Sequence, residues 1–368
     1  MMKVYFILLL LITRPLMAQV PSVTNSNGWS QSSMQEVQVV TDSVLLEKVE
    51  QNEEDKSSKR KVPHYESEVE GYREIRTRSN LNPMSRSAAP TVQGQMDQKA
   101  SQLMELDPNR VETKVLYYDA GNYDARRAVF LQEALTLNPN HKEALYLWAA
   151  NAMVTGDTLT FSKTLNTLMA LDFFPTDVVC YAEDVLLSVP QGYTLITHGR
   201  LDTYGFLGEQ FKRARKDVLN VSMELLQSPQ YRTQLGNHQL KLPIDMTIDV
   251  SYLKELIRLN PNRKFALSMT LPKPYFFGFE EELTPNGLVF LYQQETTMDD
   301  SYRSNLRLNS TMKFLECDQK KEDSYRFLLS NYLPMLMFLE STTNNHYNNS
   351  KAIETDIEQK KQRIKKAN

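Results

Sequence analysis

The stretch GYTLITHGRLDTYGFLGEQFKRARKDVLNVSM at residues 192–223 decides the fold. Its two ends, residues 193–197 and 218–223, are short apolar runs rich in strand-forming residues. Between them, Phe206, Leu207 and Phe211 lie at helical spacing. Two strands that are joined by a helix run parallel, with a right-handed connection. We therefore predict a βαβ unit with the polar residues 198–203 at the carboxyl end of its first strand, where α/β folds bind ligands.

Residues 98–190 are predicted to be helical, with features of helix-turn-helix repeats. LDPN at 106–109 and LNPN at 137–140 are 31 residues apart, close to the tetratricopeptide period. A proline at such a place cannot continue one helix but suits the first turn of the next. We expect about two such hairpins. They form either a peptide-binding groove or, as we favour, a helical buttress for the α/β part.

Residues 191–296 are the predicted α/β domain, with further strands at 263–270 and 288–292 and a loop between them. Residues 297–340 are predicted helices, in which Pro334 forces a kink or a break. The polar tail at 341–368 is interpreted as a solvated helix, with disorder and contact with anionic lipid as alternatives. The fold class is α/β plus all-α. A small parallel or mixed sheet with a βαβ unit is flanked by tetratricopeptide-like hairpins and C-terminal helices.

The N-terminal part of the chain predicts export. Residues 1–19 contain Lys3, an apolar run at 4–12 and Ala18 before Gln19. This is the anatomy of a cleaved signal peptide, and the run is too short to span a bilayer. The alternative is a buried N-terminal helix. We expect a periplasmic protein, or one peripheral at the inner face of the outer membrane, with no membrane span in the mature chain.

Residues 20–97 are rich in Ser, Gln, Asn, Glu and Lys and contain few aromatic side chains. Such a segment buries too little apolar surface to offset its ordering entropy, so we predict a disordered tether. The alternative is that the more apolar residues 35–49 dock on a partner as one strand or helix.

Charge and cysteine content exclude several classes of site. The net charge of −3 gives no field that favours nucleic acid. Cys180 and Cys317 are the two cysteines of the chain. A disulfide is allowed in an exported protein, but spacing does not show proximity, and we favour two buried, unpaired thiols. No CxxC occurs and the five His residues are scattered, so we expect no metal site and no cofactor.

One polar cluster is a candidate ligand site, and aromatic side chains are candidate partner contacts. The ligand-site candidates are His198, Arg200, Asp202 and Thr203. Asp202 or Thr203 has a local alternative, since either can cap the helix that follows, and we favour that role. The partner-contact candidates are Tyr146, Trp148, Tyr275, Phe276 and Phe277. Aromatic faces suit sugar rings, whereas three aromatic residues after Pro274 more often fill a core.

Two motifs carry a family resemblance. They comprise Gly199, Asp202, Thr203 and Tyr204 in the first, and Tyr275, Gly278, Leu283 and Gly287-Leu288-Val289 in the second. Across about residues 120–340 the chain resembles the soluble C-terminal region of bacterial protein O-mannosyltransferase-like membrane proteins. The family's GDNDT-type motif stands here as GRLDT at 199–203, with a cation in place of one acid. A divalent ion prefers several oxygen ligands, so a metal-dependent role is not carried over from the family. The chain also lacks the family's multi-span membrane half, so the resemblance implies a stand-alone exported relative that is kept for binding.

No catalytic pattern of the GxSxG, HExxH, GxxxxGK[ST] or GxGxxG type occurs. The first hypothesis is therefore a non-catalytic envelope protein that scaffolds or binds a protein partner, as a subunit of an outer-membrane secretion or surface-assembly complex. The alternative is a glycan-related enzyme or glycan-binding module that uses the loop at 198–203.

Overall fold

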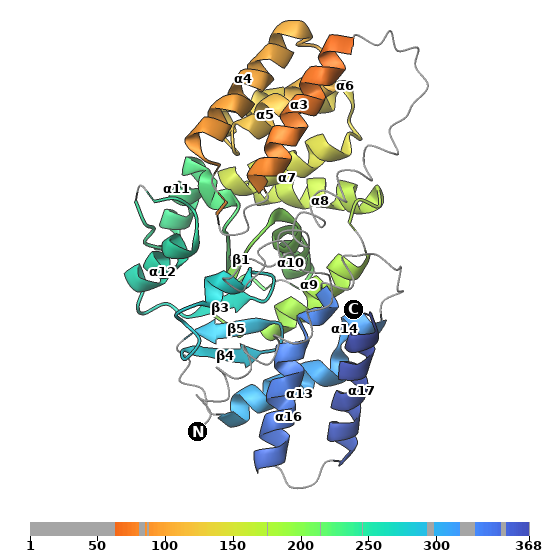
Figure 1. Cartoon of the computed structure of the whole chain (residues 1–368), viewed down its shortest axis with the longest axis vertical. Helices are drawn as coiled ribbons and strands as arrows, with labels where there is room; N and C mark the ends of the chain where they lie inside the picture. Colours follow the sequence, from red (N-terminus) through yellow and green to blue (C-terminus); the bar gives the residue numbers. More distant parts are fainter. Residues whose placement is uncertain are drawn as a thin grey trace, which may run out of the picture.

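The computed structural model describes residues 63–80, 85–86, 88–174, 176–213, 215–244, 246–292, 298–316, 328–346 and 351–367. The predicted signal peptide, the apolar residues 35–49 and Cys317 lie outside these ranges. Within them the chain is mostly helical and contains a five-stranded mixed sheet, which confirms the α/β plus all-α class. In Figure 1 the N-terminal helices lie above the sheet and the C-terminal helices below it.

The sheet has the strand order β2-β1-β3-β5-β4. Its strands are β1 (Thr194–Thr197), β2 (Leu219–Ser222), β3 (Phe265–Ser268), β4 (Leu283–Asn286) and β5 (Val289–Tyr292). The interior strand β1 pairs in parallel with both β2 and β3, and Thr194 lies opposite Leu219 and Phe265. The antiparallel neighbours β5 and β4 complete the sheet. The two strands at the ends of the opening stretch are therefore neighbours.

Strand β4 corrects the sequence prediction, which assigned a loop to this segment. Pro285 argues against a strand because it cannot donate a backbone hydrogen bond. In the structure β4 is the edge strand, where a proline is tolerated. Gly287 has a φ of +63° between β4 and β5. A glycine allows this left-handed turn, which closes the hairpin.

Helix α10 (Arg200–Lys212) lies between β1 and β2 in the chain and already includes residues 200–203 of the predicted loop at 198–203. It packs against α9 (Thr176–Ser188) and α8 (Thr158–Ala170). A Cβ at Gly208 would lie 2.9 Å from the Cδ2 atom of Leu165. The glycine therefore permits the close approach of α8 and α10.

The N-terminal helices pack in sequence order, each against the next. They are α3 (Pro63–Asn80), α4 (Pro90–Leu106), α5 (Val111–Ala120), η2 (Ala125–Arg127), α6 (Ala128–Leu137), α7 (Lys142–Thr155) and α8. Helices α3 and α4 contradict a tether at 63–80 and 90–97. Tyr65, Val69 and Tyr72 are buried at helical spacing and form a core with α4 and α5. The sequence contains this apolar stripe, but the polar composition of residues 20–97 outweighed it in the prediction.

The remaining described elements complete the α/β part and the C-terminal layer. They are η3 (Leu225–Gln227), α11 (Pro229–Asn237), α12 (Val250–Leu259), η4 (Lys273–Phe276), α13 (Met298–Thr311), α14 (Lys313–Glu316), α16 (Leu333–His346) and α17 (Lys351–Ala367). Pro334 lies in the first turn of α16, where it does not kink the helix. The tail is not a fully solvated helix, because Ile357 and Ile364 of α17 are buried.

Both faces of the sheet are covered by apolar side chains. Ile196 and Leu267 join the core on one face, whereas Leu195 and Ala266 join the core on the other. Central strands of a parallel sheet bury both faces in this way. None of the helices in the described ranges is long and apolar enough to span a membrane.

The preference for unpaired thiols was wrong. Cys180 in α9 is disulfide-bonded, and the one other cysteine of the sequence is Cys317. Spacing in the sequence carried no information on whether Cys180 is bonded, since that depends on which segments the fold brings together.

Candidate functional site

The carboxyl ends of the three parallel strands meet at one edge of the sheet. The amide of Met223 donates to the carbonyl of Thr197 at 2.9 Å, and the amide of Glu224 donates to the carbonyl of His198 at 3.1 Å. These bonds continue the pairing of β1 and β2 beyond the strands. His198 and Glu224 are consequently neighbours, and Thr270 follows β3 at the same edge.

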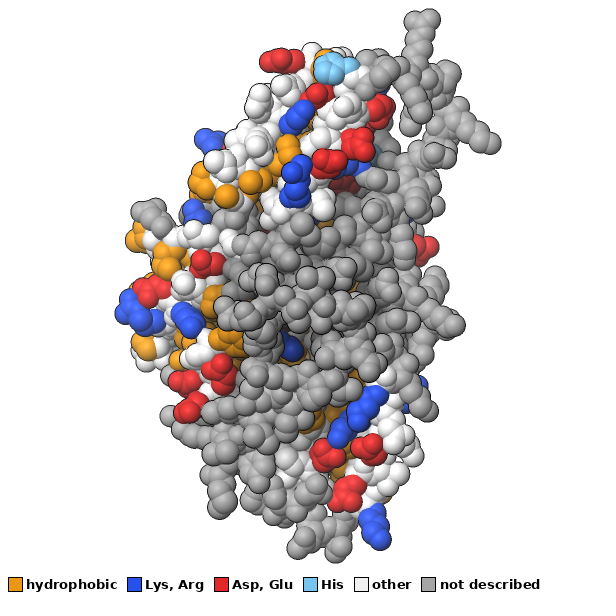
Figure 2. Space-filling view, in the orientation of Figure 1, with side chains coloured by type: hydrophobic (Ala, Val, Ile, Leu, Met, Phe, Trp, Pro, Cys, Tyr) orange, Lys and Arg blue, Asp and Glu red, His pale blue; other side chains and the backbone are white. Residues whose placement is uncertain are grey.

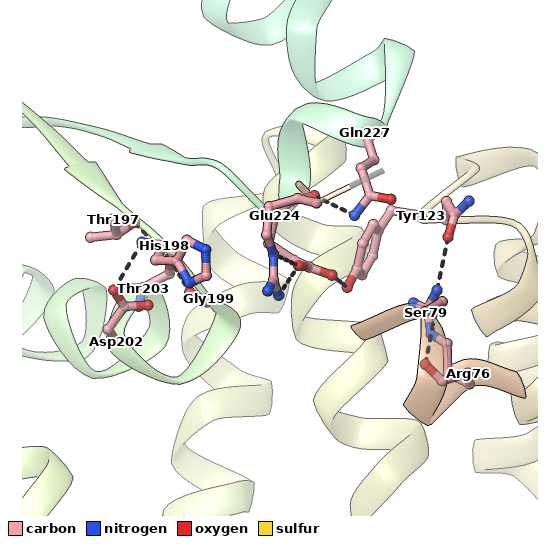
Figure 3. A network of polar contacts seen from close by, with 12 residues as sticks. Arg76, Ser79, Tyr123, Thr197, His198, Gly199, Asp202, Thr203, Glu224 and Gln227 are labelled. Carbon is pink, nitrogen blue, oxygen red and sulfur yellow. Dashed lines mark hydrogen bonds and ion pairs between the residues drawn. The ribbon is translucent and has the colours of Figure 1, made fainter. Parts of the chain in front are cut away.

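Asp202 ties this edge together. Its Oδ2 atom accepts a hydrogen bond from the amide of His198 at 3.0 Å and from the hydroxyl of Thr270 at 2.6 Å. Its Oδ1 atom accepts from the amide of Thr203 at 2.8 Å. Figure 3 shows the carboxylate of Asp202 directed at the His198 backbone. Asp202 therefore joins the ends of β1 and β3 to the first turn of α10.

Of the four predicted site residues, His198, Asp202 and Thr203 come together. The side chain of Arg200 points away from them. His198 is buried, and the centre of its ring lies 5.8 Å from that of Tyr275. The Thr203 hydroxyl donates to the carbonyl of Gly199 at 2.5 Å. The guanidinium of Arg200 lies 4.7 Å from the ring centre of Tyr146 in α7, on the side of the N-terminal helices. Arg200, Asp202 and Thr203 belong to the first turn of α10, which corrects the prediction of a loop there.

A second polar cluster surrounds Glu224, directly after β2. Its Oε2 atom accepts from the Nε atom of Arg86 at 2.5 Å and also contacts a second nitrogen of that guanidinium. Its Oε1 atom accepts from the hydroxyl of Tyr123 at 2.6 Å, as Figure 3 shows. Burial alone would raise the pKa of Glu224, but the charges of Arg86, Arg200 and Arg76 lower it to about 2. Glu224 is thus a buried, ionised carboxylate.

The polar contacts continue into the N-terminal helices. The Nε atom of Arg76 in α3 lies 3.0 Å from the Oδ2 atom of Asp119 in α5. Tyr72 donates to the same oxygen at 2.7 Å, and Arg76 also donates to Asn122 at 3.1 Å. Burial opposes the charge of Arg76, but Asp119 raises its pKa. These bonds fix α3 against α5 beside the Glu224 cluster.

The predicted partner contacts divide into core and surface residues. Tyr146, Tyr275 and Phe276 are buried, which contradicts their use as contacts in this conformation. Trp148 is half-buried and packs against the larger core. Phe277 has 47% of its surface exposed. The aromatic triplet after Pro274 therefore places two residues in the core and one at the surface.

Sequence reasoning missed Glu224, Arg86 and Tyr123. Glu224 had a usable signal, because it directly follows a predicted strand and parallel strands present ligand-binding residues at that end. Arg86 and Tyr123 had none, since they are 138 and 101 residues from Glu224 in the sequence.

The two carboxylates at this edge of the sheet, Asp202 and Glu224, are suited to few kinds of chemistry. Each of the two carboxylates accepts several hydrogen bonds from the protein itself. A general acid or base works best with a pKa near the operating pH, and the low pKa of Glu224 is the opposite arrangement. Among the described residues, no group of three or more His, Cys, Asp or Glu is placed to hold a metal ion.

No protein-family model, curated protein or solved structure matches the chain. The resemblance to the soluble region of protein O-mannosyltransferase-like proteins therefore stays a prediction that rests on the two sequence motifs.

Proposed function

We propose that this chain is a non-catalytic protein that binds or scaffolds a protein partner. The observation that carries the proposal is the internal use of the polar groups at the sheet edge. Asp202 joins β1, β3 and α10, and Glu224 accepts from Arg86 and Tyr123. Groups that are already committed to the fold cost free energy to release, so the usual ligand position of an α/β fold serves stability here.

We further propose that the protein is exported to the cell envelope and works in an outer-membrane secretion or surface-assembly complex. The disulfide at Cys180 supports this compartment, because disulfides persist in oxidising environments. The signal-like sequence at 1–19 supports export independently. We retain the finer fold assignments as proposals, namely a right-handed βαβ unit at β1-α10-β2 and tetratricopeptide-like hairpins within α5–α8.

The partner surface is proposed to lie away from the sheet edge. Large apolar side chains are exposed at Val129 and Leu137 of α6, at Leu159 of α8, and at Ile244 and Phe277 of the α/β part. In Figure 2, acidic and basic side chains are interspersed over the visible N-terminal and C-terminal helices, and apolar side chains gather near α11 and α12. Such mixed surfaces favour local apolar contacts over attraction by one sign of charge.

Purification of the tagged full chain from its native envelope, without reductant, tests this function. We expect a stoichiometric protein complex. We also expect one pair of surface substitutions, either Val129→Ser with Leu137→Ser or Ile244→Ser with Phe277→Ser, to release the partner without lowering the melting temperature. The proposal would be contradicted if the wild-type chain purified alone and if neither pair of surface substitutions changed its elution position.

A ligand screen addresses the glycan alternative. Thermal unfolding is measured with sugars, nucleotide sugars and divalent ions for the wild type and for Asp202→Asn. We expect no stabilisation of the wild type. Stabilisation by a sugar that disappears in Asp202→Asn would favour a glycan-binding site at 198–203 and overturn the non-catalytic assignment.

A further inference from the structure

A cavity of about 240 Å³ lies between α8, α9 and α10, which are neighbours in Figure 1. Its apolar lining includes Leu165 and Met169 of α8, Phe174 before α9, and Val179 of α9. The volume is just below the range of about 300–1,000 Å³ that is usual for ligand pockets. The cavity therefore suits a small occupant with an apolar body.

The walls of this cavity are fixed by the core behind them. Leu165 and Phe174 are buried members of the larger core, and the ring centre of Phe174 lies 6.4 Å from that of Tyr204. The hydroxyl of Tyr204 donates to a backbone carbonyl of α7 at 3.0 Å, which holds this ring in place. Gly205 and Gly208 of α10 also line the cavity, and as glycines they place no side chain in it. A ligand would therefore enter a space that already exists, which lowers the ordering cost of binding.

The lining also contains a buried carboxylate. The side chain of Glu209 is 7% exposed, whereas those of its ion-pair partners Lys212 and Arg213 are 56% and 42% exposed. Its Oε1 atom accepts from the Nζ atom of Lys212 at 2.6 Å. Its Oε2 atom lies 3.8 Å from the Nε atom of Arg213, which is too long for a hydrogen bond. Among the described residues no donor lies within hydrogen-bond distance of Oε2, although buried polar atoms ordinarily have a partner.

Apolar walls beside a carboxylate select one class of ligand. An ammonium would donate a charge-assisted hydrogen bond to Oε2, which is about twice as strong as a bond from a neutral hydroxyl. An anion would be repelled by the carboxylate of Glu209. A divalent metal ion needs several oxygen ligands, and Glu209 supplies the one carboxylate of the lining.

We propose that this cavity binds a small amine, whose ammonium donates to Glu209 and whose aliphatic or aromatic body lies against the apolar lining. The inference goes beyond the proposed partner binding, because it assigns a small-molecule site. Its tests need no partner, so they succeed or fail independently of that function.

Thermal unfolding of the full chain with three probes that share one phenyl body tests the charge preference. In the wild type, millimolar phenethylamine is expected to raise the melting temperature by at least about 2 °C more than phenethyl alcohol or phenylpropionate. Glu209→Gln should abolish this preference. The matched control is Glu183→Gln, because Glu183 of α9 also pairs with Arg213 but lies outside the cavity lining. A preference that is absent from the wild type, kept in Glu209→Gln or lost in Glu183→Gln would overturn the proposal.

The variant Lys212→Met separates an amine site from an anion site at the same place. The ammonium of Lys212 bonds to Oε1, so an amine that bonds to Oε2 does not need it. The stabilisation by phenethylamine should therefore be kept or increased in Lys212→Met. Weaker stabilisation by the amine would overturn the proposal. So would a shift by phenylpropionate that disappears in this variant, because it would make Lys212 the binding group.

A measurement on the wild type remains available if Glu209→Gln does not fold. The methyl signal of Met169 in a nuclear magnetic resonance spectrum is identified by its loss in Met169→Leu. Millimolar phenethylamine is expected to shift this signal with saturation, because Met169 lines the cavity. The methyl signal of the exposed Met246, identified in the same way, serves as the control and should not move. An unchanged Met169 signal, or equal shifts of both signals, would overturn the proposal.

Discussion

The two polar clusters at the sheet edge differ in how far apart their members lie in the sequence. The Asp202 cluster joins His198, Asp202 and Thr203 within six consecutive residues and also includes Thr270, which follows β3. The Glu224 cluster joins Arg86, Tyr123 and Glu224 from three distant segments. The first organises a strand end locally. The second holds the N-terminal helices on the α/β part.

This difference teaches what each carboxylate contributes. Asp202 is half-buried and bonds to neutral amides and a hydroxyl, so it acts as a polar cap. Glu224 is buried beside a guanidinium, so replacement of its carboxylate removes the anion that Arg86 faces. The strongest effects on stability should therefore come from the Glu224 cluster, although the sequence motif lies at Asp202.

The largest effect is expected for Glu224→Gln. The free energy of unfolding should fall by about 3–5 kcal/mol, because the guanidinium of Arg86 loses its anion in a buried site. Urea denaturation measures this change. Glu255→Gln is the matched control, since Glu255 pairs with Arg258 at the surface of α12 and should change stability little. Equal stability of Glu224→Gln and Glu255→Gln would contradict the expectation that the buried carboxylate of Glu224 stabilises the fold more than a surface ion pair does.

Low pH should reduce the stability of the wild type more than that of Glu224→Gln. The pKa of Glu224 is about 2 in the folded protein, below its ordinary value of 4.5. A lowered pKa stabilises the fold above the unfolded-state value, and this contribution is lost as the pH falls from about 4.5 towards 2. A pKa difference of that size corresponds to about 3 kcal/mol. Urea denaturation from pH 7 to pH 2 should show this loss in the wild type and a smaller one in Glu224→Gln. Parallel pH profiles would contradict the assignment.

A smaller effect is expected for Asp202→Asn. The amide cannot accept at both positions, so it loses bonds from the His198 amide, the Thr203 amide or the Thr270 hydroxyl. Hydrogen bonds to a charged acceptor contribute about 1.5–3 kcal/mol, which sets the expected destabilisation. Chemical denaturation at pH 7 provides the measurement. A loss that equals or exceeds that of Glu224→Gln would show that the local cap dominates the edge.

The smallest effect is expected for Thr270→Val. This substitution removes one donor to Asp202 and keeps the side-chain shape, so about 1.5 kcal/mol should be lost, the lower end of the range for a hydrogen bond to a charged acceptor. In the double variant with Asp202→Asn, the two losses should be less than additive because they share one hydrogen bond. Additive losses would mean that the two side chains do not interact in solution.

The parts of this fold that are specified locally could be predicted from the sequence. The parallel neighbours β1 and β2, the helix between them and the meeting of His198, Asp202 and Thr203 follow from residue spacing. Strand β4 could not be predicted, because Pro285 obscures an edge strand whose partners are known only in the sheet. Arg86 could not be predicted either, since no local pattern marks a contact across 138 residues. Helix α3 was missed because overall composition outweighed the spacing of Tyr65, Val69 and Tyr72.

The position of Arg86 has a practical consequence for dividing the protein. A fragment that begins at residue 98, the start of the sequence-based helical region, would lack α3, the first part of α4 and the counter-charge of Glu224. The apolar faces of α4 and α5 that meet α3 would then be open to solvent. Such a fragment should aggregate, whereas one that begins near residue 63 keeps α3 and Arg86.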